Sequence, residues 1–167
     1  MEKDVQEWIK KIEKAKGESI DLSRDEDLSI ALMNLISLEE HFYFTAMKTE
    51  NGKYLDMLQD IRNIRQKFMK KIVKSPEGEE WCISKHLLAS SMRLIEVGTK
   101  EQTKGNVKES QECFQSAFDL WSLFFAINMK MIDKKNLPEL SKDKNVKSSV
   151  GKFSQIIKKI VDCCKEW

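Results

Sequence analysis

The stretch IALMNLISLEEHFYFTAM, residues 30 to 47, decides how we expect this chain to fold. Its apolar residues fall on nearly every side of a helical wheel, which is typical of a helix surrounded by other helices. Glu39 lies in the middle of an apolar line of that wheel, where an unpaired carboxylate would be costly. The sequence therefore predicts a central helix that holds one buried acid beside a cationic or hydrogen-bonding partner.

Glycine, proline and short polar runs divide the rest of the chain into periodic segments, and no alternating strand pattern is present. The spacing of apolar residues predicts four long helices joined by connections of a few residues, which favour antiparallel neighbours. We therefore expect an all-α fold, an up-down-up-down four-helix bundle with short additional amphipathic helices at the N- and C-termini. The predicted core helices cover residues 23–48, 53–74, 76–104 and 106–134.

The predicted domain organisation follows from these segments. Residues 1–134 form the helical bundle, which begins with a short amphipathic helix at residues 4–16. A polar passage at residues 135–149 is interpreted as a linker. Residues 150–167 form a C-terminal amphipathic helix that packs either on the bundle or on a partner.

The partner of Glu39 can be predicted from the heights of residues along antiparallel helices. At about 1.5 Å per residue, Arg62 on the descending helix reaches nearly the same height as Glu39, and Arg65 lies about one turn lower. Both arginines project from the apolar side of their helix or from its edge. We therefore predict a buried ion pair between Glu39 and Arg62 or Arg65.

Composition and charge narrow the class of protein. The chain has 167 residues, of which 34% are charged and 41% hydrophobic, a balance typical of one soluble globular domain. No uncharged apolar run approaches about 18 residues, so no transmembrane segment is predicted. The first residues, MEKDVQEWIKK, lack the apolar part of a signal peptide, which indicates the cytoplasm. The formal charge of +2 gives no reason to expect nucleic-acid binding.

The cysteines and histidines offer one candidate metal site. Cys82 and His86 are four residues apart on one helical face, a spacing that can present two ligands to a transition metal. The inward Glu-x-x-His motif of four-helix carboxylate oxidases is absent. Four cysteines without a Cys-x-x-Cys pair are interpreted as free thiols. The alternative interpretation of Cys82 and His86 is a thiol beside a boundary histidine, and no other cofactor is expected.

Signals of catalysis are missing from the sequence. It contains neither of the glycine-rich phosphate-binding motifs, G-x-x-x-x-G-K-[ST] and G-x-G-x-x-G. A cysteine nucleophile at Cys82 would need a setting that stabilises the thiolate, but three glutamates lie in the same helical turn. We therefore identify no catalytic residue and do not expect an enzyme.

A line of small residues runs along the third predicted core helix. Ser84, Ser91 and Gly98 are heptad-spaced there, so a neighbouring helix can approach closely. That neighbour is either another helix of this chain or a second copy, in which case the chain forms a homodimer.

The C-terminal segment is the most basic part of the chain. From Lys135 to Trp167 it holds eight lysines and four acidic residues. Its helix is amphipathic and offers a candidate interaction surface, which could pack on the bundle, bind a protein groove or touch an anionic membrane. The residues of this candidate surface are Phe153, Ile157, Ile160, Lys158 and Lys159.

The sequence thus indicates a small helical-bundle protein that acts by binding, as a protein-interaction module or as a subunit of an assembly. A protein partner or self-association is expected. One alternative is a bundle that binds a metal or small ligand through Cys82 and His86, with or without enzymatic activity. The other is a peripheral binder of anionic membrane or nucleic acid through the basic C-terminal helix.

Overall fold

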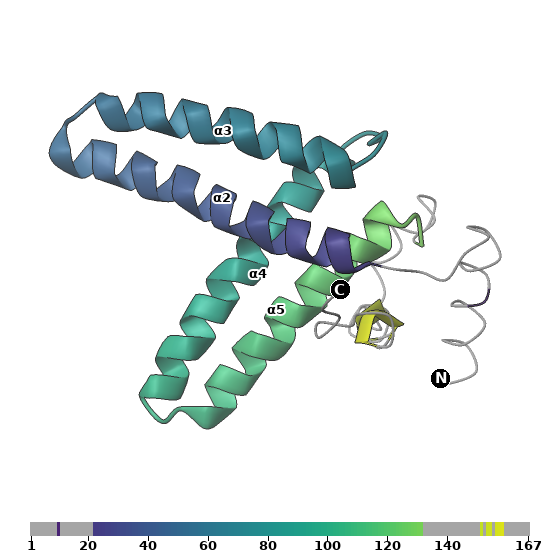
Figure 1. Cartoon of the computed structure of the whole chain (residues 1–167). Coiled ribbons are helices and arrows are strands. Elements are labelled where there is room, and N and C mark those ends of the chain that lie inside the picture. The colour runs from purple at the N-terminus through teal and green to yellow at the C-terminus, as the bar shows by residue number, and fades with distance from the viewer. Residues whose placement is uncertain (1–9, 11–21, 132–150, 152, 155, 159–167) are drawn as a thin grey trace.

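A computed structural model describes residues 10, 22–131, 151, 153, 154 and 156–158. The predicted N-terminal helix and the predicted linker lie outside these residues, apart from Lys10. Within residues 22–131 the chain forms four long α-helices and no strand, so the predicted all-α bundle is confirmed (Figure 1). The helices are α2 (Ser23–Thr49), α3 (Lys53–Ile72), α4 (Glu80–Thr103) and α5 (Val107–Asn128).

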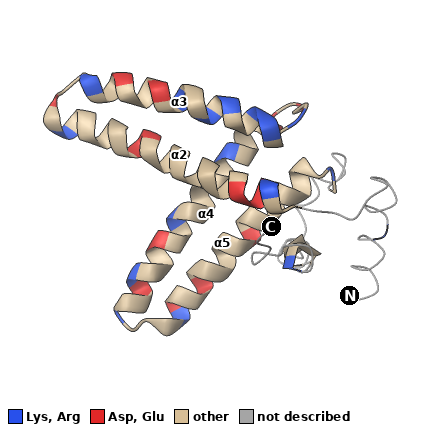
Figure 2. Cartoon of the chain, in the orientation of Figure 1, with Lys and Arg blue, Asp and Glu red and all other residues tan. Residues whose placement is uncertain are grey.

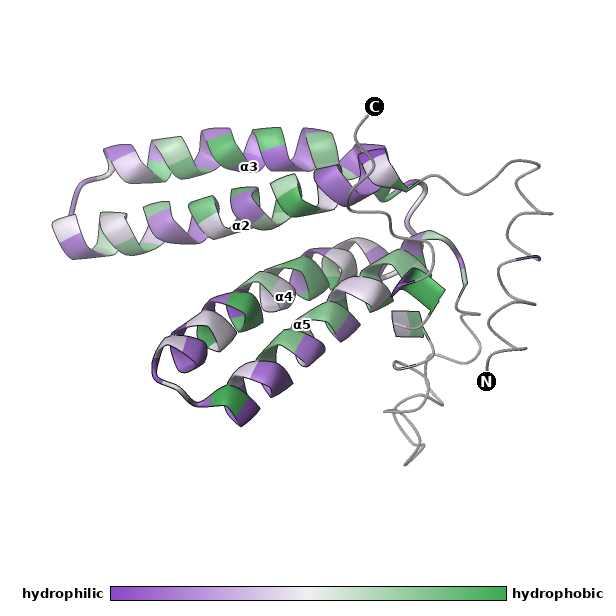
Figure 3. Ribbon diagram, turned by 60° about the horizontal axis from the view of Figure 1, so that its bottom comes forward, coloured by the Kyte–Doolittle hydropathy of each residue, from purple (hydrophilic) through white to green (hydrophobic). Residues whose placement is uncertain are grey.

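The four helices form two antiparallel hairpins, α2 with α3 and α4 with α5 (Figure 1). The hairpins meet near the start of α2 and the end of α5, and they diverge towards their two connecting turns (Figures 1 and 3). The up-down-up-down order of the helices is as predicted. The two hairpins are nevertheless splayed, so the core is concentrated where they cross.

The core at the crossing is rich in large apolar side chains. Phe124 and Phe125 of α5 are almost completely buried and pack edge to face, with their ring centroids 5.2 Å apart. Trp121 of α5 donates a hydrogen bond of 2.8 Å from Nε1 to Ser29 Oγ of α2, inside the core. Because both groups are buried, this bond fixes one helix of each hairpin against the other.

The expectation that α2 is enclosed on nearly every side is wrong for part of its surface. Leu32 and Met33 are buried at the crossing, but Ile30, Phe44 and Met47 remain 47%, 60% and 53% exposed. For Phe44 and Met47 the physical reason is the splay of the hairpins, which draws α4 away from the C-terminal part of α2 and leaves α3 as its close neighbour there (Figure 1). Consequently, α2 presents apolar surface that the described part of the chain leaves exposed.

Three helix boundaries differ from the prediction by two or more residues. The third helix begins at Glu80 instead of 76, because Ser75 and Gly78 adopt left-handed backbone angles (φ 48° and 55°) that interrupt a helix. The fourth ends at Asn128 instead of 134 in a Schellman motif, where Met131 N–H donates to Ala126 O and Lys130 takes a φ of 57°. The second helix ends at Ile72, two residues early. Within the described residues, no helix combines the length and hydrophobicity that crossing a membrane requires.

Candidate functional site

The α2–α3 hairpin carries an apolar groove to which α4 and α5 contribute no lining residue; we call it the outer groove. Its volume is about 420 Å³. Its single polar side chain is that of Asn34, whose Nδ2 donates a hydrogen bond of 3.0 Å to the carbonyl of Ile30 in the same helix. The lining residues are Leu28, Ala31, Asn34, Leu35, Leu38, Ile64 and Phe68.

Several residues of the outer groove are partly buried. Leu28, Leu35 and Phe68 pack against the core with part of each side chain while another part remains accessible. Ile64 of α3, opposite them, is exposed. The side chains that line the groove therefore pack on the core with one face and are accessible on the other, and the core holds them in position.

Lysines border the outer groove on α3. Lys71 Nζ lies 4.9 Å from the ring centroid of Phe68, a groove residue. Most basic residues of α3, blue in Figure 2, lie in its C-terminal half, whereas its acidic residues lie in the N-terminal half. We call Lys67, Lys70, Lys71 and Lys74 the lysine cluster. All four are exposed, and none forms an ion pair with another described residue.

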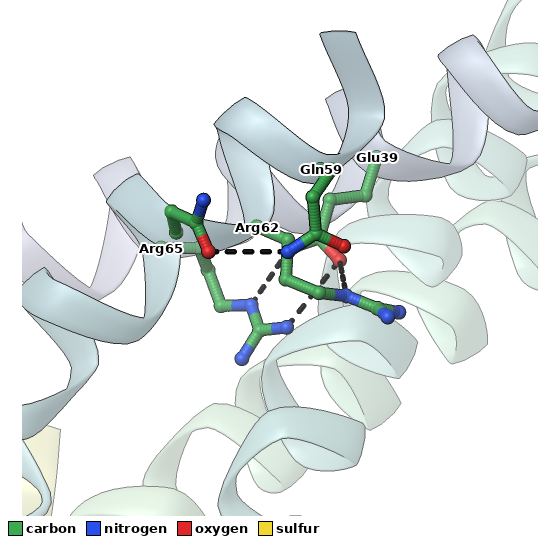
Figure 4. A network of polar contacts seen from close by, with 5 residues as sticks. Glu39, Gln59, Arg62 and Arg65 are labelled. Atoms are coloured by element: carbon green, nitrogen blue, oxygen red, sulfur yellow. Dashed lines mark hydrogen bonds and ion pairs between the residues drawn. The ribbon is translucent and has the colours of Figure 1, made fainter. Parts of the chain in front are cut away.

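A buried ion cluster joins α2 to α3 (Figure 4). The Oε1 atom of Glu39 accepts a hydrogen bond of 2.7 Å from Arg65 Nε, and Oε2 accepts two of 3.3 Å, from Arg65 Nη2 and Arg62 Nε. Glu39 and Arg65 are buried, whereas Arg62 is about half exposed. Both arginines that the sequence proposed as partners thus contact the carboxylate. Because the geometry is met at one alignment of the two helices, the cluster sets the register of the hairpin that carries the outer groove.

A second, more polar cleft lies between the hairpins. It has a volume of about 500 Å³ and is lined by residues of α2 and α4, including His41, Phe44 and Glu96. Its ion pair joins Glu40 Oε2 to Arg93 Nη2 at 2.6 Å. These two charges satisfy each other across the cleft, so neither is left unpaired for a ligand.

The predicted metal pair lies on the surface of α4. Cys82 and His86 are both exposed. Among the described residues, no group of three or more His, Cys, Asp and Glu side chains is placed to hold a metal ion. The other described cysteine, Cys113, is buried, and this burial, reinforced by nearby glutamates, raises the pKa of its thiol.

The small residues of α4 face α5 of the same chain. Ser91 Oγ donates a hydrogen bond of 2.8 Å to the carbonyl of Ala117, and Asn128 Nδ2 donates one of 3.1 Å to Ser84 Oγ. Gly98 is so close to α5 that a Cβ atom there would lie 2.7 Å from Phe114 Cε1. Of the two readings of this line of small residues, packing within one chain therefore holds, and the line is unavailable as a dimer seam.

The described part of the C-terminal helix packs on α5. Ile157 is fully buried, Phe153 is partly buried and Lys158 is exposed, with its Nζ 5.3 Å from the ring centroid of Phe118. Ser154 Oγ donates a hydrogen bond to Asp119 Oδ1. Of the candidate surface, Ile157 is therefore part of the core; Ile160 and Lys159 lie outside the described residues.

Comparison with known proteins gives no match: no family model, no curated protein and no solved structure is significantly similar to this chain.

The outer groove and its lysines are the features that the sequence did not predict as a site. Lysines at the C-terminal end of a helix are expected from the helix macrodipole alone, so those at the end of α3 do not indicate a site in the sequence. The signal for the groove was present in the apolar residues that surround α2, but those residues were assigned to the interior of the bundle.

Proposed function

We propose that this chain is a protein-interaction module, or a subunit of an assembly, and that a protein partner covers its outer groove. The observation that supports this proposal best is that α2 is apolar on more sides than the described part of the chain covers. Leu28, Leu35 and Leu38 line a groove made by α2 and α3 alone, with nearly no polar group in it.

The energetics of burial favour this use of the groove. Burial of apolar surface yields about 25 cal/mol per Å², and soluble monomers rarely expose contiguous apolar patches larger than a few hundred Å². A folded chain that keeps Ile64 and the leucines of the groove accessible gains free energy when another molecule covers them. The polar cleft between the hairpins offers less, because desolvating Glu40 and Arg93 would offset the gain.

The chain offers a matched control for a test of this proposal. Ile64 in the outer groove and Val97 on α4 are exposed to nearly the same extent, 42% and 45%, but Val97 does not line the groove. A difference between the two positions therefore reports their location and not their general accessibility.

Site-specific photo-crosslinking applies this control. A photoreactive amino acid replaces Ile64 in one variant and Val97 in another, each is produced in its native cells, and adducts are resolved by mass after irradiation. We expect a discrete protein adduct, either a different protein or a second copy, at position 64 and none at position 97. The same adducts at both positions, or none at position 64, would refute the proposed function.

A further inference from the structure

We propose that the occupant of the outer groove is an acidic amphipathic helix of a partner protein. This inference rests on the proposed function and adds the chemistry of the partner. It is carried by the shape of the groove and by the lysines beside it, which form no ion pair with another described residue.

The shape of the outer groove fits a helix. Two antiparallel helices leave a furrow into which the side-chain ridge of a third helix packs. The groove runs from Leu28 to Leu38, which corresponds to about 15 Å along α2, or roughly three helical turns. A partner helix would therefore place apolar anchors at positions i, i+3 or i+4, and i+7. An added β-strand is a poor occupant, because the backbone groups of α2 and α3 are already bonded within their helices.

The charge beside the groove selects acidic flanks on that helix. Lys67 and Lys71 follow Ile64 at three and seven residues along α3, so they stand on the same side of the helix as this groove residue. The contact of Lys71 with Phe68 places its ammonium group at the groove itself. The lysine cluster forms no ion pair with a carboxylate of another described residue. Carboxylates that flank the apolar anchors of the bound helix could therefore form ion pairs with these lysines.

The same charges favour one orientation of the partner helix. The acidic residues of α3, Asp56 and Asp60, lie in its N-terminal half, whereas the lysine cluster lies in its C-terminal half and just beyond its last residue, Ile72 (Figure 2). We therefore expect the acidic part of the partner helix to lie beside the lysines at the end of α3.

An anionic membrane is the competing occupant, because it also combines apolar and negative groups. A membrane-bound helix buries a protruding apolar face in the lipid. Here Leu28, Leu35 and Phe68 are recessed between two helices and packed on the core, which suits an inserted ridge better than a flat bilayer.

Synthetic peptides test the inference. The probe is a fluorescein-labelled peptide of about 18 residues, a length at which helices become stable in water, with leucines at helical spacing and glutamates elsewhere. One companion peptide has lysine in place of every glutamate, and another has the same composition with the leucines scrambled. Fluorescence anisotropy measures the binding of each to the full chain, and circular dichroism checks that every variant is folded.

We expect the glutamate peptide to bind the wild-type chain more tightly than either companion, and more weakly as salt is added. Ile64→Glu and the double variant Lys67→Glu/Lys71→Glu should each weaken this binding about tenfold or more, and the double variant should prefer the lysine peptide. Two control variants carry the same changes on the α4–α5 hairpin: Val97→Glu and the double variant Lys100→Glu/Lys108→Glu. Both controls should bind the glutamate peptide as tightly as the wild type does.

Two results would overturn the inference. The first is equal binding of the glutamate and lysine peptides, or no binding of the glutamate peptide. The second is binding to phosphatidylserine-containing vesicles that Ile64→Glu abolishes, which would assign the groove to a membrane. If either result were found and photo-crosslinking still gave a protein adduct at position 64, the proposed function would stand. Only the inference that the partner is an acidic helix would be refuted.

Discussion

At the scale of single residues, the carboxylate of Glu39 is the strongest constraint on the α2–α3 hairpin. It neutralises Arg65 inside the hairpin and also holds Arg62, which is half exposed. This pairing could be anticipated from the sequence, because an acid on an apolar line needs a partner and two arginines lie at matching heights. That both arginines contact one carboxylate, each through Nε, depends on side-chain geometry that spacing does not specify.

Glu39→Gln should therefore be strongly destabilising, because it leaves the buried guanidinium of Arg65 without a counter-charge. We expect the free energy of unfolding in urea to fall by about 3–5 kcal/mol. The neighbouring Glu40 pairs with Arg93 in an exposed ion pair, so Glu40→Gln should cost at most about 1 kcal/mol. Equal losses in the two variants would show that the Glu39 cluster is not effectively buried.

The two described cysteines should differ in reactivity. Burial raises the pKa of the Cys113 thiol, so the thiolate that reacts is scarcer at neutral pH, whereas Cys82 is exposed. Alkylation at pH 7 followed by peptide mass spectrometry should modify Cys82 in the native protein and Cys113 only after unfolding. As the pH is raised, the rate of modification of Cys113 should begin to increase at a higher pH than the rate for Cys82. Simultaneous modification at pH 7 would contradict the buried placement of Cys113.

At the scale of helices, periodicity predicted where each element exists better than where it ends. The end of α5 shows why. Lys130 adopts a left-handed backbone conformation, with a positive φ, that at the end of a helix is usual for glycine or asparagine. The start of α4 shows the opposite error. Proline is favoured at the first position of a helix, so Pro76 agrees with the predicted start at residue 76, yet the chain makes a further turn at Gly78 before α4 begins.

The close contact between α4 and α5 gives a prediction at this scale. Gly98→Ala gains up to about 1 kcal/mol of helix propensity but places a Cβ atom 2.7 Å from Phe114 Cε1. We expect a net loss of about 1–3 kcal/mol in the free energy of unfolding, since overpacking forces the helices apart. Adding Phe114→Leu should restore part of the loss. Gly52→Ala, where a Cβ atom meets nothing within 4 Å, is the control and should change stability by less than about 0.5 kcal/mol.

At the scale of the whole molecule, the splay of the two hairpins is the feature that the sequence left open. Short turns make neighbouring helices antiparallel, so each hairpin followed from connection length. The angle between the hairpins depends on the segment between Ile72 and Glu80, which contains two left-handed residues, and on the burial of Trp121 against Ser29. Helical periodicity specifies neither the path of this segment nor the contact of Trp121 with Ser29. Because the angle between the hairpins could not be predicted, the outer groove could not be predicted either.

The splay can be measured between the two connecting turns. In a closed four-helix bundle, neighbouring helices are about 8–10 Å apart along their length, so the turns would be adjacent. Spin labels attached to Glu50→Cys and Lys104→Cys, in one chain whose native cysteines are replaced by serine, should report a clearly longer separation by pulsed electron resonance. A distribution centred near the closed-bundle spacing would contradict the divergent arrangement of the hairpins (Figure 3).

The most direct test of the central claim, that a partner covers the outer groove, compares cysteine labelling inside and outside the cell. Ile64→Cys and Val97→Cys are introduced separately in a Cys82→Ser background, and maleimide labelling of each position is followed by mass spectrometry. In the purified protein both positions should label at similar rates, because Ile64 and Val97 are about equally exposed. In permeabilised native cells, position 64 should be labelled about tenfold more slowly than position 97, since the bound partner shields it. Equal labelling of the two positions in cells would contradict the account.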